Sequence, residues 1–120
     1  MNETPRDNHR IRTAKDFELI FKKGNHKRGK NINLWVYEGG APPSAATAGP
    51  RLGVVVSKKV DRRASRRNTW KRRIREAWRL CECRIPKGAM ALIQARPVHE
   101  PAAFSAIKAE LDALLTKMGF

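Results

Sequence analysis

The sequence is short of acidic residues, and this shortage is its first informative property. Its 120 residues include 11 Asp and Glu against 26 Lys and Arg, which gives a formal net charge of +15 at pH 7. It also lacks any run of about 18 apolar residues, so no transmembrane helix is predicted. Residues 1 to 10 have no apolar core of the kind found in signal peptides. We therefore expect a cytoplasmic protein with no membrane partner.

Cysteine and histidine are also scarce. Cys81 and Cys83 are spaced C-x-C, and the three histidines, His9, His26 and His99, are scattered along the chain. Structural zinc sites usually use C-x2-C or longer pairs together with a second pair elsewhere, and a second pair is missing here. We therefore expect two reduced thiols and no metal ion held by the protein.

Motifs that carry catalysis are missing as well. The acidic residues show no converging pair, and the sequence contains no Ser-His-Asp pattern, no H-E-x-x-H and no G-x-x-x-x-G-K. No catalytic residue is predicted on the protein, and nothing in it suits a catalytic Mg²⁺ ion. If the protein takes part in catalysis, a partner must hold the active centre.

What the sequence does contain is a concentrated block of positive charge at residues 57–79. Eleven of these residues are Lys or Arg and two, Asp61 and Glu76, are acidic, so the block carries +9 of the total +15. A field of this density requires a polyanion to neutralise it, and a nucleic-acid backbone is the usual one.

Periodicity and turn residues predict an α+β fold in which a small sheet packs against about three helices. We expect one domain over residues 1–120, frayed at 1–9 and with a mobile loop at 39–50. A capping-box-like Thr13 to Asp16 and a stop at Gly24 bound the first helix. The predicted helices are 13–23, 62 or 64 to 79, and 104–118; the predicted strands are 32–38, 52–57 and 89–95, with a further short strand near 27–31. The strands 32–38 and 52–57 are interpreted as a long-looped hairpin.

The strand at 32–38 has two different faces. Ile32, Leu34 and Val36 fall on one face, which belongs on the core, whereas Asn33, Trp35 and Tyr37 fall on the other. Aromatic rings beside an amide are suited to a partly wet surface.

The basic block divides in the same way when it is placed on a helical wheel. Trp70, Ile74, Ala77 and Cys81, with Trp78 beside them, form an apolar stripe. The opposite side is polar and cationic and comprises Asn68, Lys71, Arg72, Arg75 and Arg79. A disordered tail has no reason to separate residues in this way. The pattern therefore predicts a helix docked by its tryptophan side, with cations facing outward.

The cationic side is suited to phosphates, because the planar guanidinium of Arg pairs its donors with phosphate oxygens. Asn68 adds an amide that can reach a base edge or a 2′-hydroxyl. Other interpretations are a solvated face, a membrane- or calmodulin-binding helix and a DNA-binding helix. A non-enzymatic RNA-binding module, such as a small ribosomal or RNA-assembly protein, also explains the charge.

The order of motifs resembles one family. The run Gly53-Val-Val-Val-Ser-Lys-Lys59, followed by Ala64-x-x-Arg67-Asn68-x-x-Lys71-Arg72-x-x-Arg75-Glu76, is similar to the bacterial ribonuclease P protein component. Asp16-Phe17-x-x-x-Phe21-x-x-Gly24 and Ile93-Gln-Ala95-Arg96-Pro97 match it in type and order, so the resemblance spans roughly residues 10 to 118. It implies a four-stranded sheet with a left-handed strand-helix-strand crossover, an exception to the usual rule.

The resemblance also implies the function. The protein would be the small subunit of a ribonucleoprotein that removes the 5′ leader from precursor tRNA, and no obligate protein partner is expected. The catalytic RNA would carry out the chemistry and bind most of the Mg²⁺.

Site residues follow by position. The residues implied to face the catalytic RNA are Arg67, Asn68, Lys71, Arg72 and Arg75, extended by Lys58 and Lys59 and, from the wheel, by Arg79. The residues expected to line a cleft for the single-stranded leader are Phe17, Phe21 and Trp35, with Asn33 beside them. Phe17 and Phe21 are also compatible with an ordinary core pair. The sequence departs from the family at Thr69, where a cation is usual, and at Trp70, which is larger than usual and is assigned to the core.

Overall fold

The computed structural model describes residues 14–38, 50–86, 88–98 and 101–120. The expected frayed segment 1–9, the capping residue Thr13 and loop residues 39–49 lie outside the described residues. The described elements follow in the order α2 (Ala14–Lys23), β1 (Asn25–Arg28), β2 (Ile32–Tyr37), β3 (Arg51–Val55), α4 (Ala64–Cys81), a 3-10 turn (Glu82–Arg84), β4 (Met90–Ala95) and α5 (Phe104–Lys117). This order confirms the predicted α+β fold, including the further short strand, which begins slightly earlier than expected.

The four strands form one mixed sheet in the order β1-β2-β4-β3. The pairs β1–β2 and β2–β4 are antiparallel, whereas β3 and β4 run parallel and are joined by the crossover through α4. Strand β4 therefore lies inside the sheet, between β2 and β3.

The predicted hairpin of strands 32–38 and 52–57 is wrong. Strand β4 separates β2 from β3, so these two strands are consecutive in the chain but not neighbours in the sheet. The physical reason lies in β4 itself, whose residues Met90 to Ile93 are buried on both sides of the sheet. A strand that is apolar on both faces is buried best at a central position in the sheet. If β2 and β3 paired as a hairpin, β4 could not lie between them.

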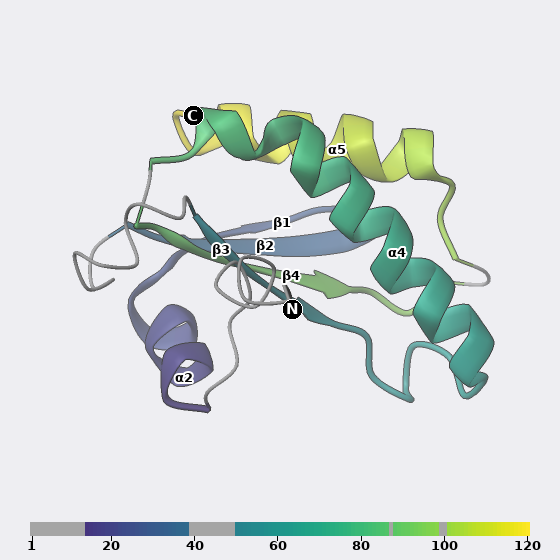
Figure 1. Ribbon diagram of the computed structural model, residues 1–120. Coiled ribbons are helices and arrows are strands. Elements are labelled where there is room, and N and C mark those ends of the chain that lie inside the picture. The colour runs from purple at the N-terminus through teal and green to yellow at the C-terminus, as the bar shows by residue number, and fades with distance from the viewer. Residues whose placement is uncertain (1–13, 39–49, 87, 99–100) are drawn as a thin grey trace, which may run out of the picture.

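Helices cover the two faces of the sheet unequally (Figure 1). Helices α4 and α5 lie together over one face, and α2 lies under the other. The larger core joins α4 and α5 to the sheet through residues such as Trp70, Ile74 and Leu111. The smaller core lies beneath α2 and contains Ile20, Trp35, Met90 and Leu92. The sheet thus separates the basic helix from the aromatic residues near α2.

The turn between β1 and β2 is fastened to α5. The carboxylate of Glu110 accepts hydrogen bonds from the backbone N–H groups of Asn31 (2.8 Å) and Ile32 (3.1 Å) and from the Asn31 amide (3.0 Å). Arg96 donates to the carbonyl oxygen of Gly29 at 2.6 Å. A side chain at Gly29 would overlap the Glu110 carboxylate, so glycine is needed here for close approach. These contacts hold edge strand β1 in position.

Candidate nucleic-acid interface

Helix α4 docks by the stripe that the sequence predicts. Its buried residues are Trp70, Ile74, Ala77, Trp78 and Cys81. Trp70 is 1% exposed and belongs to the larger core, which confirms its assignment to packing. Because the apolar side is committed to the core, the orientation of the opposite side is fixed by the fold.

The opposite side of α4 faces outward and is cationic. Asn68, Arg72 and Arg79 are exposed, and Lys71 and Arg75 are partly exposed. Arg79 lies 3.6 Å from the carboxylate of Glu76, but both side chains are well exposed, so this ion pair restrains Arg79 only weakly. The structure thus brings all five residues of the predicted outward side onto one surface.

Arg67 has a second task. Its Nη1 donates to the backbone carbonyl oxygens of Asp61 (3.1 Å) and Arg62 (2.9 Å), which lie in the loop ahead of α4. This predicted RNA-binding residue therefore also holds the loop against the start of the helix.

Asp61 is the acidic centre of this loop. It is the only acidic residue between positions 57 and 75. Its Oδ1 accepts a hydrogen bond from the backbone N–H of Arg63 at 2.9 Å, and its Oδ2 lies 3.8 Å from Arg66 Nη1. Since Arg63 is the residue that caps α4, Asp61 organises the helix start and gathers two arginines around it.

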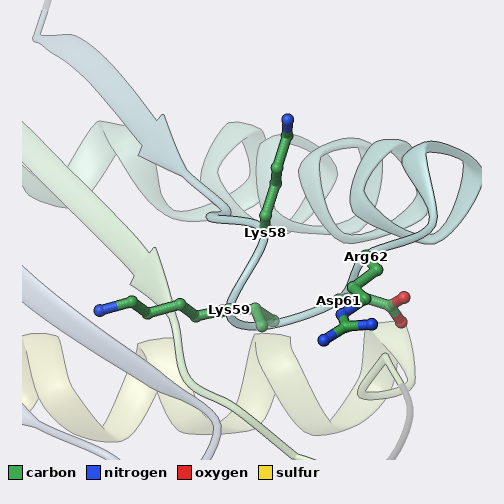
Figure 2. Close-up of a pocket in the computed structure, with 5 residues that line it drawn as sticks. Lys58, Lys59, Asp61 and Arg62 are labelled. Carbon is green, nitrogen blue, oxygen red and sulfur yellow. The ribbon is translucent and has the colours of Figure 1, made fainter.

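A pocket lies at this loop and is lined by Lys58, Lys59, Val60, Asp61 and Arg62. Figure 2 shows the Lys58 and Lys59 side chains extending in different directions, with Arg62 beside Asp61. Lys58 and Lys59 are predicted site residues, whereas Arg62, which lines the same pocket, was not among them. The signal was present in the Arg62-Arg63 pair, but a helical wheel does not extend to residues in a loop.

Two further polar residues of α4, Arg73 and Thr69, donate hydrogen bonds to backbone carbonyl oxygens of the protein itself. Arg73 donates to the carbonyl oxygens of Pro101 (3.3 Å) and Ala102 (2.8 Å), so its charge is directed at the segment before α5. Thr69, where the family usually has a cation, donates its hydroxyl to the Ser65 carbonyl oxygen at 3.0 Å. Thr69 is not one of the five residues on the outward side of α4, so the absence of a cation at this position does not interrupt that surface.

The predicted leader-cleft residues lie on the other face of the sheet, under α2. Phe17 is partly buried, and its ring would lie 2.9 Å from a Cβ placed on Gly53, so it packs directly on the backbone of β3. Phe21 is 47% exposed, whereas Trp35 is 9% exposed and belongs to the smaller core. The structure thus places Trp35 deeper than the wet position expected from the strand pattern.

The rings around Trp35 explain its burial. The Phe21 ring meets Trp35 edge-on, with centroids 4.9 Å apart and an interplanar angle of 78°. The His26 ring stacks on Trp35 at 4.2 Å and 8°. Burial, and then the positive charge of Arg28, lower the pKa of His26 from its usual value. The stacking of His26 was not predicted from the sequence, because its place opposite Trp35 depends on the β1–β2 register.

Asn33 completes this face. Its amide Nδ2 donates to Gln94 Oε1 at 3.3 Å across β2 and β4. Its Oδ1 is buried and, among the described residues, has no hydrogen-bond partner. Because this oxygen has almost no accessible surface, a ligand from outside the chain cannot reach it, and the role of Asn33 that the structure shows is to join β2 to β4.

Comparisons with known proteins place the chain in a family. The family model described as Ribonuclease P matches residues 6–119. The Ribonuclease P protein component of Microcystis aeruginosa is 30% identical over 109 residues, which cover 91% of this chain and 89% of the relative.

Solved structures agree. The RNase P protein of Thermotoga maritima matches with a TM-score of 0.72 at 31% identity and covers 90% of this chain and 96% of that one. The RNase P protein of Staphylococcus aureus matches with a TM-score of 0.74 at 26% identity, over 92% of this chain and 94% of that one. With nearly its whole length matched in sequence and in fold, the chain belongs to the ribonuclease P protein component family.

Proposed function

We infer that this chain is the RNA-binding protein subunit of a bacterial ribonuclease P, the endoribonuclease that removes the 5′ leader from precursor tRNA. The observation that carries this inference is helix α4, which is docked by a tryptophan stripe and presents Asn68, Lys71, Arg72, Arg75 and Arg79 outward. Membership of the family supplies the identity of the partner, a catalytic RNA.

The outward side of α4 is the surface that binds this RNA. Arg72 and Arg79 offer planar donor groups to phosphate oxygens, and Lys71 contributes a compact charge. Lys58, Lys59 and Arg62 extend the same surface into the pocket ahead of the helix. Because phosphate contacts release counterions, binding by this surface should weaken steeply as salt concentration rises.

The face under α2 binds the single-stranded leader of the precursor tRNA. Aromatic rings stack on bases with little sequence preference, as a substrate with variable leaders requires. The Phe21 ring is exposed there, and Phe17 and Trp35 support it from the smaller core. Asn33 lies on the same face of β2 as Trp35 and supports this face through its hydrogen bond to Gln94.

The Mg²⁺ ions that this enzyme class requires lie mainly on the RNA in this proposal. The acidic groups of the basic surface do not fit a resident ion, because the Asp61 carboxylate already binds the Arg63 N–H and Arg66. Within the part of the chain that the structure describes, His, Cys, Asp and Glu do not gather in a group of three that could hold a metal. No step of the chemistry is therefore assigned to the protein.

The proposed place of action is the cytoplasm, where tRNA precursors are made. Cys83 is exposed and is not part of a disulfide, as is usual for cysteines in a reducing compartment. None of the described helices is long and apolar enough to cross a membrane.

The test is to identify the RNA that copurifies with the tagged protein from its own cells. One dominant, structured, non-ribosomal RNA, which together with the protein cleaves precursor tRNA, is the expected result. A variant with Arg72→Ala and Arg79→Ala should recover much less of it. Recovery of ribosomal RNA alone would instead support a ribosomal or assembly protein and contradict the proposal.

A further inference from the structure

The strand register places four residues in one row across the sheet, on the face beneath α2. His26 pairs with Trp35, Trp35 with Leu92, and Leu92 with Gly53. Trp35 and Leu92 are in the smaller core, where the Phe17 ring lies over Gly53. His26 is the outermost residue of the row, on edge strand β1, and it is exposed. The row therefore runs from a covered end at β3 to an open end at β1.

The His26 ring is held in a defined orientation at that open end. It lies parallel to Trp35, with centroids 4.2 Å apart and an interplanar angle of 8°. One face of the imidazole is therefore occupied by the indole, and the exposure of His26 must come from its other face and its edge. Strand β1 is itself fixed by Glu110 and Arg96 at the next turn. The structure thus presents a flat aromatic surface that needs little reorganisation before a ligand stacks on it.

The surroundings of this ring suit a nucleic-acid strand. Burial and the nearby Arg28 lower the pKa of His26, which favours the uncharged form of the imidazole. Cations lie near it in the chain, namely Lys22 and Lys23 at the end of α2 and Arg28, which is two residues further along β1 and therefore on the same face of the sheet. Aromatic platforms flanked by cations are the usual means by which proteins hold single-stranded nucleic acid. Trp35 has little open surface for this task, because it is 9% exposed.

We propose that His26 is a base-binding residue for the leader, on which one unpaired base stacks and extends the Trp35–His26 pair by a further ring. This inference rests on the proposed function and adds to it a contact that the sequence analysis did not assign. The competing explanation is that His26 only covers Trp35, in which case its outer face binds nothing.

The test compares His26→Ala with His26→Phe in the enzyme reconstituted with its RNA. Two substrates are used, a precursor tRNA with a leader and the same tRNA without one. Removing a stacked ring costs about 1–3 kcal/mol, which corresponds to an affinity loss of about 5- to 150-fold. We expect His26→Ala to weaken binding of the leader substrate by an amount in this range and to leave the leaderless tRNA unaffected. His26→Phe keeps a ring and should keep most of the affinity.

A fluorescent base analogue supplies a readout that a purely structural role would not move. The analogue is placed at each leader position in turn, and stacking on His26 should quench it at one position in the wild type and in His26→Phe but not in His26→Ala. The proposal is overturned if His26→Ala binds the leader substrate as tightly as the wild type does. Equal loss on both substrates, or equal loss in the Phe variant, would likewise show that His26 acts only by packing.

The wild-type measurements separate this inference from the proposed function. If the wild-type protein neither binds a catalytic RNA nor favours leader-bearing substrates, the proposed function itself fails. If the wild-type protein does both and only the His26 variants are without effect, the stacking role of His26 fails alone.

Discussion

At the scale of single residues, Asp61 shows how one acid can serve a basic surface. Its carboxylate accepts a hydrogen bond from the N–H of Arg63 and lies 3.8 Å from Arg66. Its backbone carbonyl oxygen accepts a hydrogen bond from the Arg67 guanidinium. An acid in a polyanion-binding loop opposes the partner electrostatically. Its value here is to order the loop and the first turn of α4.

We predict that Asp61→Ala lowers the free energy of unfolding by about 1 kcal/mol, because a hydrogen bond to the Arg63 N–H is lost. Asp61→Asn keeps an acceptor oxygen and should lose less. Denaturant unfolding of the three proteins measures this difference. Equal stability of all three would show that the contact does not support the helix start.

The two cysteines should differ in reactivity. The Cys81 thiol donates to Asp112 Oδ1 at 3.1 Å, and burial together with this carboxylate raises its pKa to about 11. Since the thiolate is the reactive form, a higher pKa leaves less of it at pH 8. Cys83 is exposed.

We predict that a thiol reagent at pH 8 modifies the folded protein once, at Cys83, and twice after denaturation. Mass spectrometry of wild type and Cys83→Ser measures this. Rapid modification of the folded Cys83→Ser protein would contradict the burial of Cys81.

At the scale of elements, one side of α4 packs on the core and the other presents cations outward. The cationic side can be tested without disturbing the packed side. Arg72 is exposed. We predict that Arg72→Ala weakens binding of the catalytic RNA and reduces the slope of log affinity against log salt by about 0.7–0.9, equivalent to one phosphate contact. Lys117→Ala, on α5, removes the same charge away from this surface and is the matched control. If both variants showed the same salt slope, the RNA would have to bind at a surface other than the cationic side of α4.

The turn that positions β1 is a second element with a clear test. We predict that Glu110→Ala lowers stability by about 2–3 kcal/mol, because hydrogen bonds from Asn31 and Ile32 to a charged acceptor are lost. Amide hydrogen exchange at Asn31 and Ile32 should speed up more than exchange in β4. Glu110→Gln keeps one acceptor oxygen, so its stability should lie between that of the wild type and that of Glu110→Ala. Unchanged exchange at the turn would refute the role given to Glu110.

The elements themselves were largely predictable from sequence, because their signals are local. The stripe from Trp70 to Cys81 follows from a period of 3.6 residues, and the end of α2 follows from Gly24, whose N–H bonds to the Ile20 carbonyl oxygen. Local signals did not predict that β2 pairs with β4 instead of β3, because that pairing joins segments far apart in the chain, and the crossover from β3 through a helix to β4 was expected only from the family resemblance. The stacking of His26 on Trp35 depends on the β1–β2 register, which the sequence pattern left open.

At the scale of the whole molecule, the sheet separates the two proposed binding surfaces. Helix α4 lies over one face and α2 lies under the other (Figure 1), and the aromatic residues Phe17 and Trp35 belong to the smaller core on the α2 side. With these roles, the protein could touch its catalytic RNA and the substrate leader at the same time without the two competing for one surface. The net charge of +15 suits both proposed partners, since each is a polyanion.

The central claim is that the protein acts by helping a catalytic RNA to hold its substrate and its metal ions. The most direct measurement is cleavage of a leader-bearing precursor tRNA by that RNA over a range of Mg²⁺ concentrations, with and without the protein. The account predicts that the protein lowers the Mg²⁺ concentration required and tightens substrate binding, and that the protein alone cleaves nothing. An unchanged Mg²⁺ requirement together with unchanged substrate affinity would contradict it.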